Sequence, residues 1–288
     1  MAADQHQPAL PASAERRLRE LAGTEGALFT STLSVNEWAL GHSAGVEPIA
    51  QVMGSSVYHV GWQNQWFSSG WSQAGHTEEL AVLSEAWNES RRRALARLEQ
   101  EARLVGAHAV VGVDVRRGDH DWAPDAVEWV VTGTAVRLPG VPPTQRPVLS
   151  DLSGQEFSLL ARAGCRPLGI VAASTVVYVV SGRASRNAMS GGLFGSGWRN
   201  QELTDYTQGV YDARELALGR INLQAQELRA DGVVGVHIDQ HHRLRRVGSD
   251  SNERIDLVIT FHVLGTAIED TPARAPLDAV PVLTVTEV

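Results

Sequence analysis

The chain has 288 residues, of which 43 % are apolar and 20 % are charged, a composition typical of a folded protein with room for two domains. Its net charge is −8, and all 25 of its Lys and Arg residues are arginines. This balance excludes nucleic acid as the main partner, because phosphate binding needs clustered positive charge. The single cysteine, Cys165, excludes an intrachain disulfide and a metal site with several thiolates.

The chain begins with a segment, 1–25, that we expect to be flexible apart from a short helix near Glu15–Leu21. Its first ten residues lack the charged and apolar regions of a signal peptide. The longest nearly apolar run, 170–180, is about half as long as a membrane span. We therefore expect a cytoplasmic protein. A Pro-rich stretch at 138–147 is typical of a linker, and 269–288 forms a C-terminal tail.

Residues 26–137 and 148–268 carry the same pattern twice. The stretch 105–113, Val-Gly-Ala-His-Ala-Val-Val-Gly-Val, corresponds to 228–236, Leu-Arg-Ala-Asp-Gly-Val-Val-Gly-Val. A second pair follows, with Thr-Gly-Thr-Ala-Val ending at Val136 and Leu-Gly-Thr-Ala-Ile ending at Ile268. An internal duplication of this kind predicts two domains of one fold.

Each copy opens on Ser-x-x-Glu, the spacing of a capping box that begins a short helix. A strand rich in Val, Ile and Tyr follows, then a Gly-rich loop, then a helix of about 25 residues with apolar side chains three and four apart. Two further strands close the copy. In the second copy a longer, basic loop from His241 to Arg254 joins them. The expected elements are capping boxes at Ser34 and Ser153, strands at 48–60 and 167–180, helices at 80–105 and 203–228, and strands at 109–115, 127–136, 233–239 and 255–268.

These elements predict an α+β fold made of two tandem units. Each unit has a three-stranded antiparallel sheet wrapped around one long helix, with a short helix before it. Sheets of three short strands leave open edges, and edges are commonly buried against a neighbour. Assembly is therefore expected from the topology.

The long helix, the Gly-Ala-His-Ala-Val-Val-Gly entry to the next strand and the strand that ends in Gly-Thr-Ala-Val resemble the YbjQ family. That family is also called UPF0145, or the heavy-metal-binding domain family. The resemblance covers both repeats. It implies a fold similar to the dodecin subunit and a homo-oligomer in the form of a pentameric ring. Two features depart from the family pattern: short helices begin at Ser34 and Ser153, and His108 replaces the Asp seen at Asp231.

Metal-like spacing occurs at His237, Asp239 and His241. Alternate residues of a strand point to one face, so two imidazoles and a carboxylate would lie together there. Such ligands suit zinc or a similar divalent ion, the one cofactor that the sequence suggests. The alternative is a solvated strand end that leads into the basic loop.

Two uncharged loops, 61–71 and 190–198, are rich in glycine and aromatic residues. Clustered aromatics with few charges mark contacts with a protein partner or a membrane surface. The alternative is that these rings pack within their own domain. The residues expected to bind a partner are Trp62, Trp66, Phe67, Trp71, Phe194 and Trp198.

Arginines recur at matching positions of the two long helices, Arg91 with Arg214 and Arg97 with Arg220. They form either subunit contacts of the oligomer or a solvated, ion-paired helix face. The chain has no phosphate-binding loop and no arrangement of nucleophile and base, so we expect no enzymatic activity. The sequence thus favours a ring-forming structural or binding module. Metal binding is the alternative, and small-molecule binding at a domain interface, by analogy with the fold, is a third option.

Overall fold

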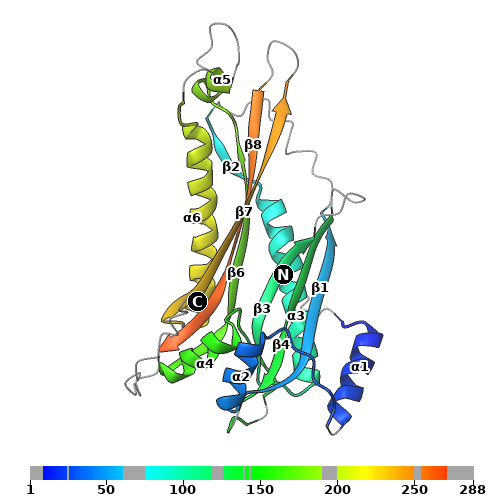
Figure 1. Ribbon diagram of the computed structural model, residues 1–288. Helices are drawn as coiled ribbons and strands as arrows, with labels where there is room; N and C mark the ends of the chain where they lie inside the picture. The colour runs from blue at the N-terminus through cyan, green and yellow to red at the C-terminus, as the bar shows by residue number, and fades with distance from the viewer. Residues whose placement is uncertain are drawn as a thin grey trace, which may run out of the picture.

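The computed structural model describes residues 9–24, 26–60, 75–118, 126–138, 140–142, 144–189, 200–248 and 254–270. Two sheets, each packed against one long helix, make up most of the molecule (Figure 1). We call the unit within 26–137 domain 1 and the unit within 148–268 domain 2. Helix α1 (Ala12–Gly23) packs against the long helix of domain 1.

Domain 1 follows the predicted order of elements, with one short strand, β2, that the sequence did not predict. Both the capping box at Ser34 and the long amphipathic helix are confirmed. Its elements are α2 (Val35–Ser43), β1 (Glu47–His59), β2 (Thr77–Glu79), α3 (Ala81–Leu104), β3 (Ala109–Gly118) and β4 (Ala126–Arg137).

Domain 2 repeats the short helix, the long helix and the three long strands of domain 1, and it adds a short strand, β5, and a short helix, α5, that the sequence did not predict. The capping box at Ser153 is present, with Glu156 bonded back to it. The elements of domain 2 are β5 (Val148–Leu149), α4 (Gly154–Arg162), β6 (Cys165–Val179), α5 (Arg183–Met189), α6 (Thr204–Glu227), β7 (Gly232–Val247) and β8 (Arg254–Asp270).

Each long helix lies close to its own sheet because small residues line the contact. A Cβ atom at Gly54 of β1 would lie 1.9 Å from the carbonyl oxygen of Ala94 in α3. A Cβ atom at Gly209 of α6 would lie 2.3 Å from Val179 of β6. Buried apolar side chains recur every three or four residues along both helices, at Ala94, Leu98 and Ala102 in α3 and at Ala217, Ile221 and Ala225 in α6.

The expectation of three strands per sheet needs correction, because the domains exchange short strands. The sheet of domain 1 has the order β1-β4-β3-β5, and its fourth strand belongs to domain 2. The sheet of domain 2 has the order β2-β6-β8-β7, and its fourth strand belongs to domain 1. Two- and three-residue strands carry too little hydrophobic pattern to be seen in the sequence.

The predicted basic loop after His241 is also wrong. Strand β7 continues to Val247 and pairs with β8 in unbroken register from His237 opposite Leu264 to Val247 opposite Arg254. The charged residues are tolerated because β7 is the last strand of its sheet and is exposed along most of its length.

His108, which departs from the family motif, makes the same contact as the Asp it replaces. Its Nδ1 accepts a hydrogen bond from the Leu138 N–H at 3.0 Å. Asp231 accepts one from the Asp270 N–H at 2.8 Å, at the matching place in domain 2. Both side chains therefore fasten the end of the last strand. No helix within the described ranges is long and apolar enough to cross a membrane.

Candidate functional site

The site that the fold builds most fully is the junction between the two domains. Strand β5 and the residues after it add to the free edge of β3. The Ser150 N–H donates to the Val110 carbonyl at 2.9 Å, and the Val113 N–H donates to the Ser150 carbonyl at 3.0 Å. The Gly112 N–H donates to the Leu152 carbonyl at 2.8 Å. On the other side β2 adds to β6, with Thr77 opposite Val179 and Glu79 opposite Val177.

Arg91 of α3 forms the polar centre of this junction. It is 4 % exposed and donates to three neutral acceptors: Ser174 Oγ, the Ala172 carbonyl at 2.7 Å and Asn88 Oδ1 at 2.6 Å. Two of these acceptors lie on β6 of domain 2. Burial lowers the pKa of the Arg91 guanidinium to about 9. A charge held in this way fixes the position of α3 on β6, because moving the helix would take the buried charge away from its two acceptors on β6.

His262 of β8 packs between aromatic rings of domain 1. It stacks on Trp87 with ring centroids 4.9 Å apart and meets Trp129 edge-on at 5.1 Å. Its Nδ1 lies 2.8 Å from Ser174 Oγ. Arg91 donates to that oxygen, and the hydroxyl can in turn donate to Nδ1 of an imidazole that carries its proton on Nε2. Nε2 is buried, and no described residue is its hydrogen-bond partner.

The pKa of His262 lies well below its usual value. Burial is the largest cause, and the positive charges of Arg91 and Arg117, together with His241, add to it. The imidazole is therefore neutral at pH 7. Its role in the junction is to pack and to accept a hydrogen bond, which differs from a general acid–base role near neutral pH.

An ion pair closes the far side of the junction. Arg220 of α6 lies 2.7 Å from Glu79 Oε1 at the end of β2, and its Nη1 donates to the Ser174 carbonyl at 3.2 Å. The matching arginine of domain 1, Arg97, donates to the Ser55 carbonyl of β1.

The surfaces used in this junction recur in an exposed form elsewhere on the chain. Phe157 of α4 is 6 % exposed and packs on Ala109 and Val111 of domain 1. Its counterpart in α2, Trp38, is 38 % exposed. The counterpart of Arg91 is Arg214, whose side chain is 45 % exposed.

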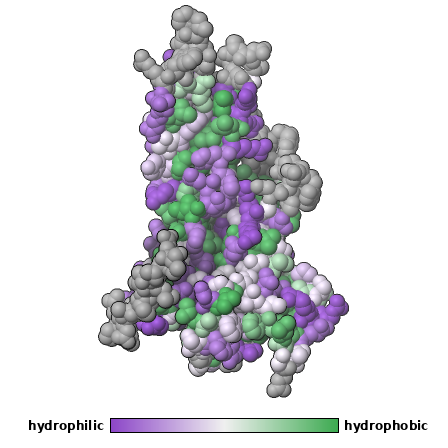
Figure 2. Space-filling view, viewed as in Figure 1, coloured by the Kyte–Doolittle hydropathy of each residue, from purple (hydrophilic) through white to green (hydrophobic). Residues whose placement is uncertain are grey.

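The sheet edges show the same contrast. β3 is covered by β5, whereas its counterpart β7 ends its sheet with no strand beside it among the described residues. β6 is covered by β2, whereas its counterpart β1 ends the sheet of domain 1. The segment 200–202, which corresponds to β2, is exposed and pairs with no described strand. In Figure 2 hydrophobic side chains reach the surface beside α6 and around the base of the molecule, near α2 and α4.

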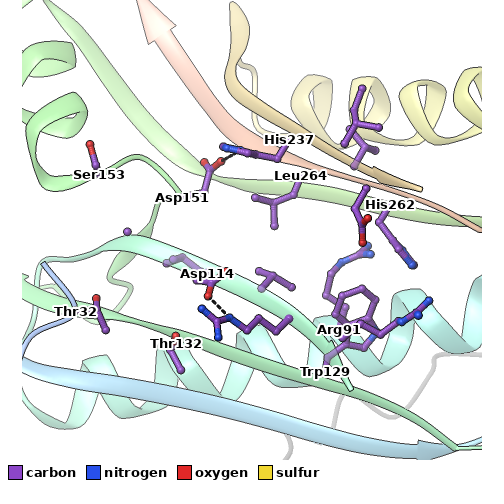
Figure 3. Close-up of a pocket in the computed structure, with 18 of the residues that line it drawn as sticks. Thr32, Arg91, Asp114, Trp129, Thr132, Asp151, Ser153, His237, His262 and Leu264 are labelled. Atoms are coloured by element: carbon purple, nitrogen blue, oxygen red, sulfur yellow. Dashed lines mark hydrogen bonds and ion pairs between the residues drawn. The ribbon is translucent and has the colours of Figure 1, made fainter. Parts of the chain in front are cut away.

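A groove of about 720 Å³ also lies between the domains (Figure 3). It is lined by β3 of domain 1, by β7 and β8 of domain 2 and by the capping-box residues of α2 and α4. Each aspartate that lines the groove lies beside an arginine or a histidine side chain. Asp114 pairs with Arg116 at 2.6 Å, Asp239 with His241 at 2.9 Å, and Asp151 lies 3.4 Å from His237.

Asp151 is the most buried of these carboxylates. Burial raises its pKa, while a hydrogen bond from Thr266 and the nearby His237 lower it. The groove is the place where small-molecule binding at a domain interface would occur, and that function stays a prediction.

The structure does not bring the three residues of the predicted metal site together around one point. His237, Asp239 and His241 alternate along β7 as expected. His237 Nδ1 lies 2.7 Å from the Gly235 carbonyl oxygen, whereas His241 bonds to Asp239. In the parts of the chain that the structure describes, no three His, Cys, Asp or Glu side chains are placed to hold one metal ion.

The predicted arginines fall into different settings. Arg91 is buried against domain 2 of its own chain, so the solvated-face alternative is wrong for it, whereas Arg92 and Arg93 do pair with Glu89. The helix rotates by about 100° per residue, which separates Arg91 from its two neighbours. The predicted partner-binding residues, Trp62, Trp66, Phe67, Trp71, Phe194 and Trp198, lie outside the described residues.

Sequence reasoning missed Phe157, Ser174 and His262. Ser174 and His262 sit in strands whose pattern indicates only burial, and the position of His262 is occupied by Val130 in the first repeat. A signal was available for Phe157, because it holds the same position in the second repeat as Trp38, another aromatic residue, holds in the first.

Comparison with known proteins agrees with the duplication. A model of the YbjQ family, described as "Putative heavy-metal-binding", matches residues 42–139 and again residues 167–270. The chain belongs to the YbjQ family. The "Encapsulin nanocompartment protein Rv1762c" of Mycobacterium tuberculosis is 40 % identical over 215 residues, which cover 73 % of this chain and 77 % of that protein. A "UPF0145 protein" of Methanococcus vannielii is 42 % identical over 60 residues, 21 % of this chain and 55 % of that protein.

None of these names is that of an enzyme, which agrees with the sequence-based expectation for this YbjQ-family chain. No solved structure matches the chain significantly.

Proposed function

We propose that this YbjQ-family chain is a structural subunit that joins copies of itself head to tail. The observation that carries the proposal is the exposed counterpart of the domain junction. The β3 edge and the α3 face, which domain 1 offers to domain 2, recur on domain 2 as β7 and α6. The α4 and β6 surfaces, which domain 2 offers to domain 1, recur on domain 1 as α2 and β1.

One copy would therefore offer β7 and α6 to α2 and β1 of the next. Exposed apolar side chains lie on both sides of this contact, at Val35, Trp38, Met53 and Val57 on one side and at Tyr211, Val236 and Ile238 on the other. A head-to-tail contact uses two different surfaces, so it repeats until the rotation closes a ring. A closed ring leaves no such surface open, and the resemblance to the family favours five members.

The relative named as an encapsulin nanocompartment protein supports a structural role of the same kind. We propose that the assembled ring acts in a protein compartment and contacts another protein through its two aromatic, Gly-rich loops. Replacing Trp66 and Trp71 with Ser should abolish capture of that partner without changing the melting temperature. Association of the wild-type protein with liposomes would instead assign these loops to a membrane surface.

Trp38 offers the sharpest test of self-assembly, because it occupies the position of the buried Phe157. Trp38→Ala should weaken self-association by about 30-fold or more, the loss typical of a central aromatic contact. Leu216→Ala is the matched control: Leu216 is an exposed apolar residue of α6 whose counterpart Arg93 stays exposed in the junction. The measurement is analytical ultracentrifugation over a dilution series. Equal association of wild type and Trp38→Ala, or a wild type that is monomeric, would contradict the proposal.

A further inference from the structure

We infer that Arg97 of one copy and Glu202 of the next form the ion pair that sets the register between neighbouring copies. The inference rests on the proposed self-assembly and names the polar contact that would make it specific. It follows from an ion pair that the chain already forms between its own domains.

Within the chain, Glu79 ends β2, the strand that domain 1 adds to β6. Arg220 of α6 meets Glu79 at 2.7 Å and also donates to the Ser174 carbonyl of β6. Arg220 thus bonds to β6 of its own sheet through Nη1 and to Glu79 of the added strand β2 through Nη2. A strand that slipped by one residue would bring Glu78, on the opposite face, to the place of Glu79.

The arginine half of this arrangement is repeated in domain 1. Arg97 holds the position of Arg220, and its Nη1 donates to the Ser55 carbonyl, which holds the position of the Ser174 carbonyl. Arg97 Nε is buried and has no hydrogen-bond partner in the part of the chain that the structure describes. The described residues place no carboxylate within ion-pair distance of Arg97.

The glutamate half is repeated in domain 2. The sequence Thr-Glu-Glu-Leu ending at Leu80 corresponds to Asn-Gln-Glu-Leu ending at Leu203, which places Glu202 at the position of Glu79. The backbone enters the two long helices in the same conformation, with φ −80° and ψ 71° at Leu80 and φ −91° and ψ 79° at Leu203. Glu202 is exposed and has no hydrogen bond or ion pair with any described residue.

Domain 1 therefore carries the arginine of the pair and domain 2 the glutamate, each without its counterpart among the described residues. If 200–202 of one copy adds to the open edge of β1 in the next, as β2 adds to β6, Glu202 arrives beside Arg97. The pair would be partly buried at the contact, where removing one partner leaves the other charge desolvated. The pair would make the contact specific, because a surface that placed a positive charge beside Arg97 would be repelled.

The test uses charge reversal in the full chain, with association measured by analytical ultracentrifugation. Arg97→Glu and Glu202→Arg should each weaken self-association by about 30-fold or more. The double variant should associate within a few-fold of wild type. Glu227→Arg, an exposed reversal near the end of α6, is the control and should have no effect.

Mixing the two single variants separates loss of the pair from loss of folding. In a mixture, every contact between unlike variants brings one glutamate and one arginine together at positions 97 and 202. Mixed chains should therefore associate where neither variant associates alone, although a five-membered ring would keep at least one contact between like variants and recover less fully than the double variant. The inference is overturned if the single variants associate like wild type, or if neither mixing nor the double variant restores association. A monomeric wild type would instead refute the proposed self-assembly.

Discussion

Lowering the pH should weaken the domain junction through His262. The imidazole is buried between Trp87 and Trp129, and it accepts a hydrogen bond from Ser174 only when it is neutral. The charged groups that act on it are Arg91, Arg117 and His241, and each of them opposes a second positive charge. Protonation would therefore place a second buried cation beside Arg91.

The size of the effect follows from proton linkage. The unfolded chain takes up a proton at this histidine near pH 6.5, whereas the lowered pKa of His262 keeps the folded chain unprotonated. The unfolded state then binds more protons, so the free energy of unfolding falls as the pH falls below 6.5. One pKa unit corresponds to about 1.4 kcal/mol, so the loss between pH 7 and pH 5 is at most about 2 kcal/mol, the limit for a histidine that stays unprotonated in the folded chain.

Urea unfolding at pH 7, 6 and 5 would measure this loss in wild type and in His262→Gln. The glutamine amide does not titrate, so the variant should be less stable at pH 7 but should lack this part of the pH dependence. Comparing the two proteins cancels the titration of Asp151, Glu99 and Glu101, whose pKa values are raised by burial. Identical pH dependence in the two proteins would refute the assignment of His262 as a buried neutral group.

Two further substitutions and one metal analysis test the fold and the site. Gly54→Ala should destabilise the protein by about 3 kcal/mol in thermal or urea unfolding, because its Cβ would meet the backbone of α3, whereas Gly41→Ala, with its nearest atom at 3.7 Å, should not. Arg91→Ala should cost about 3 kcal/mol by removing the two buried hydrogen bonds that Arg91 donates to β6, and Arg92→Ala on the exposed side should change stability by less than about 0.5 kcal/mol. Elemental analysis of the purified protein should find no stoichiometric divalent metal; one ion per chain that His237→Ala removes would assign a metal site to β7.

The sequence predicted the elements of each domain because their signals are local. Ser34 and Ser153 each sit three residues before a Glu, and both capping boxes form as that spacing implies. The long helices carry their apolar face in the sequence, and the buried residues follow it. The strand from His241 to Val247 was missed because its arginines suppress the hydrophobic alternation that marks a half-buried strand.

The junction between the domains was beyond prediction because its contacts depend on how two folded units meet. Helical spacing places Arg91, unlike Arg92 and Arg93, in line with the buried Ala94, but only the packing of α3 on β6 shows that it is buried between the domains. Strands as short as β2 and β5 form because a neighbouring edge offers them hydrogen bonds. The repeat did contain a clue besides the match of Trp38 with Phe157. Arg97 and Arg220 hold the same position, and each donates to a carbonyl of the strand beside it.

Native mass spectrometry of the full-length protein tests the central claim, self-assembly through the repeated junction, most directly. Head-to-tail closure predicts one discrete multiple of the 31.1 kDa chain that persists on dilution. A mass of 31.1 kDa alone at micromolar concentration would show that β1 and β7 stay open and would contradict self-assembly.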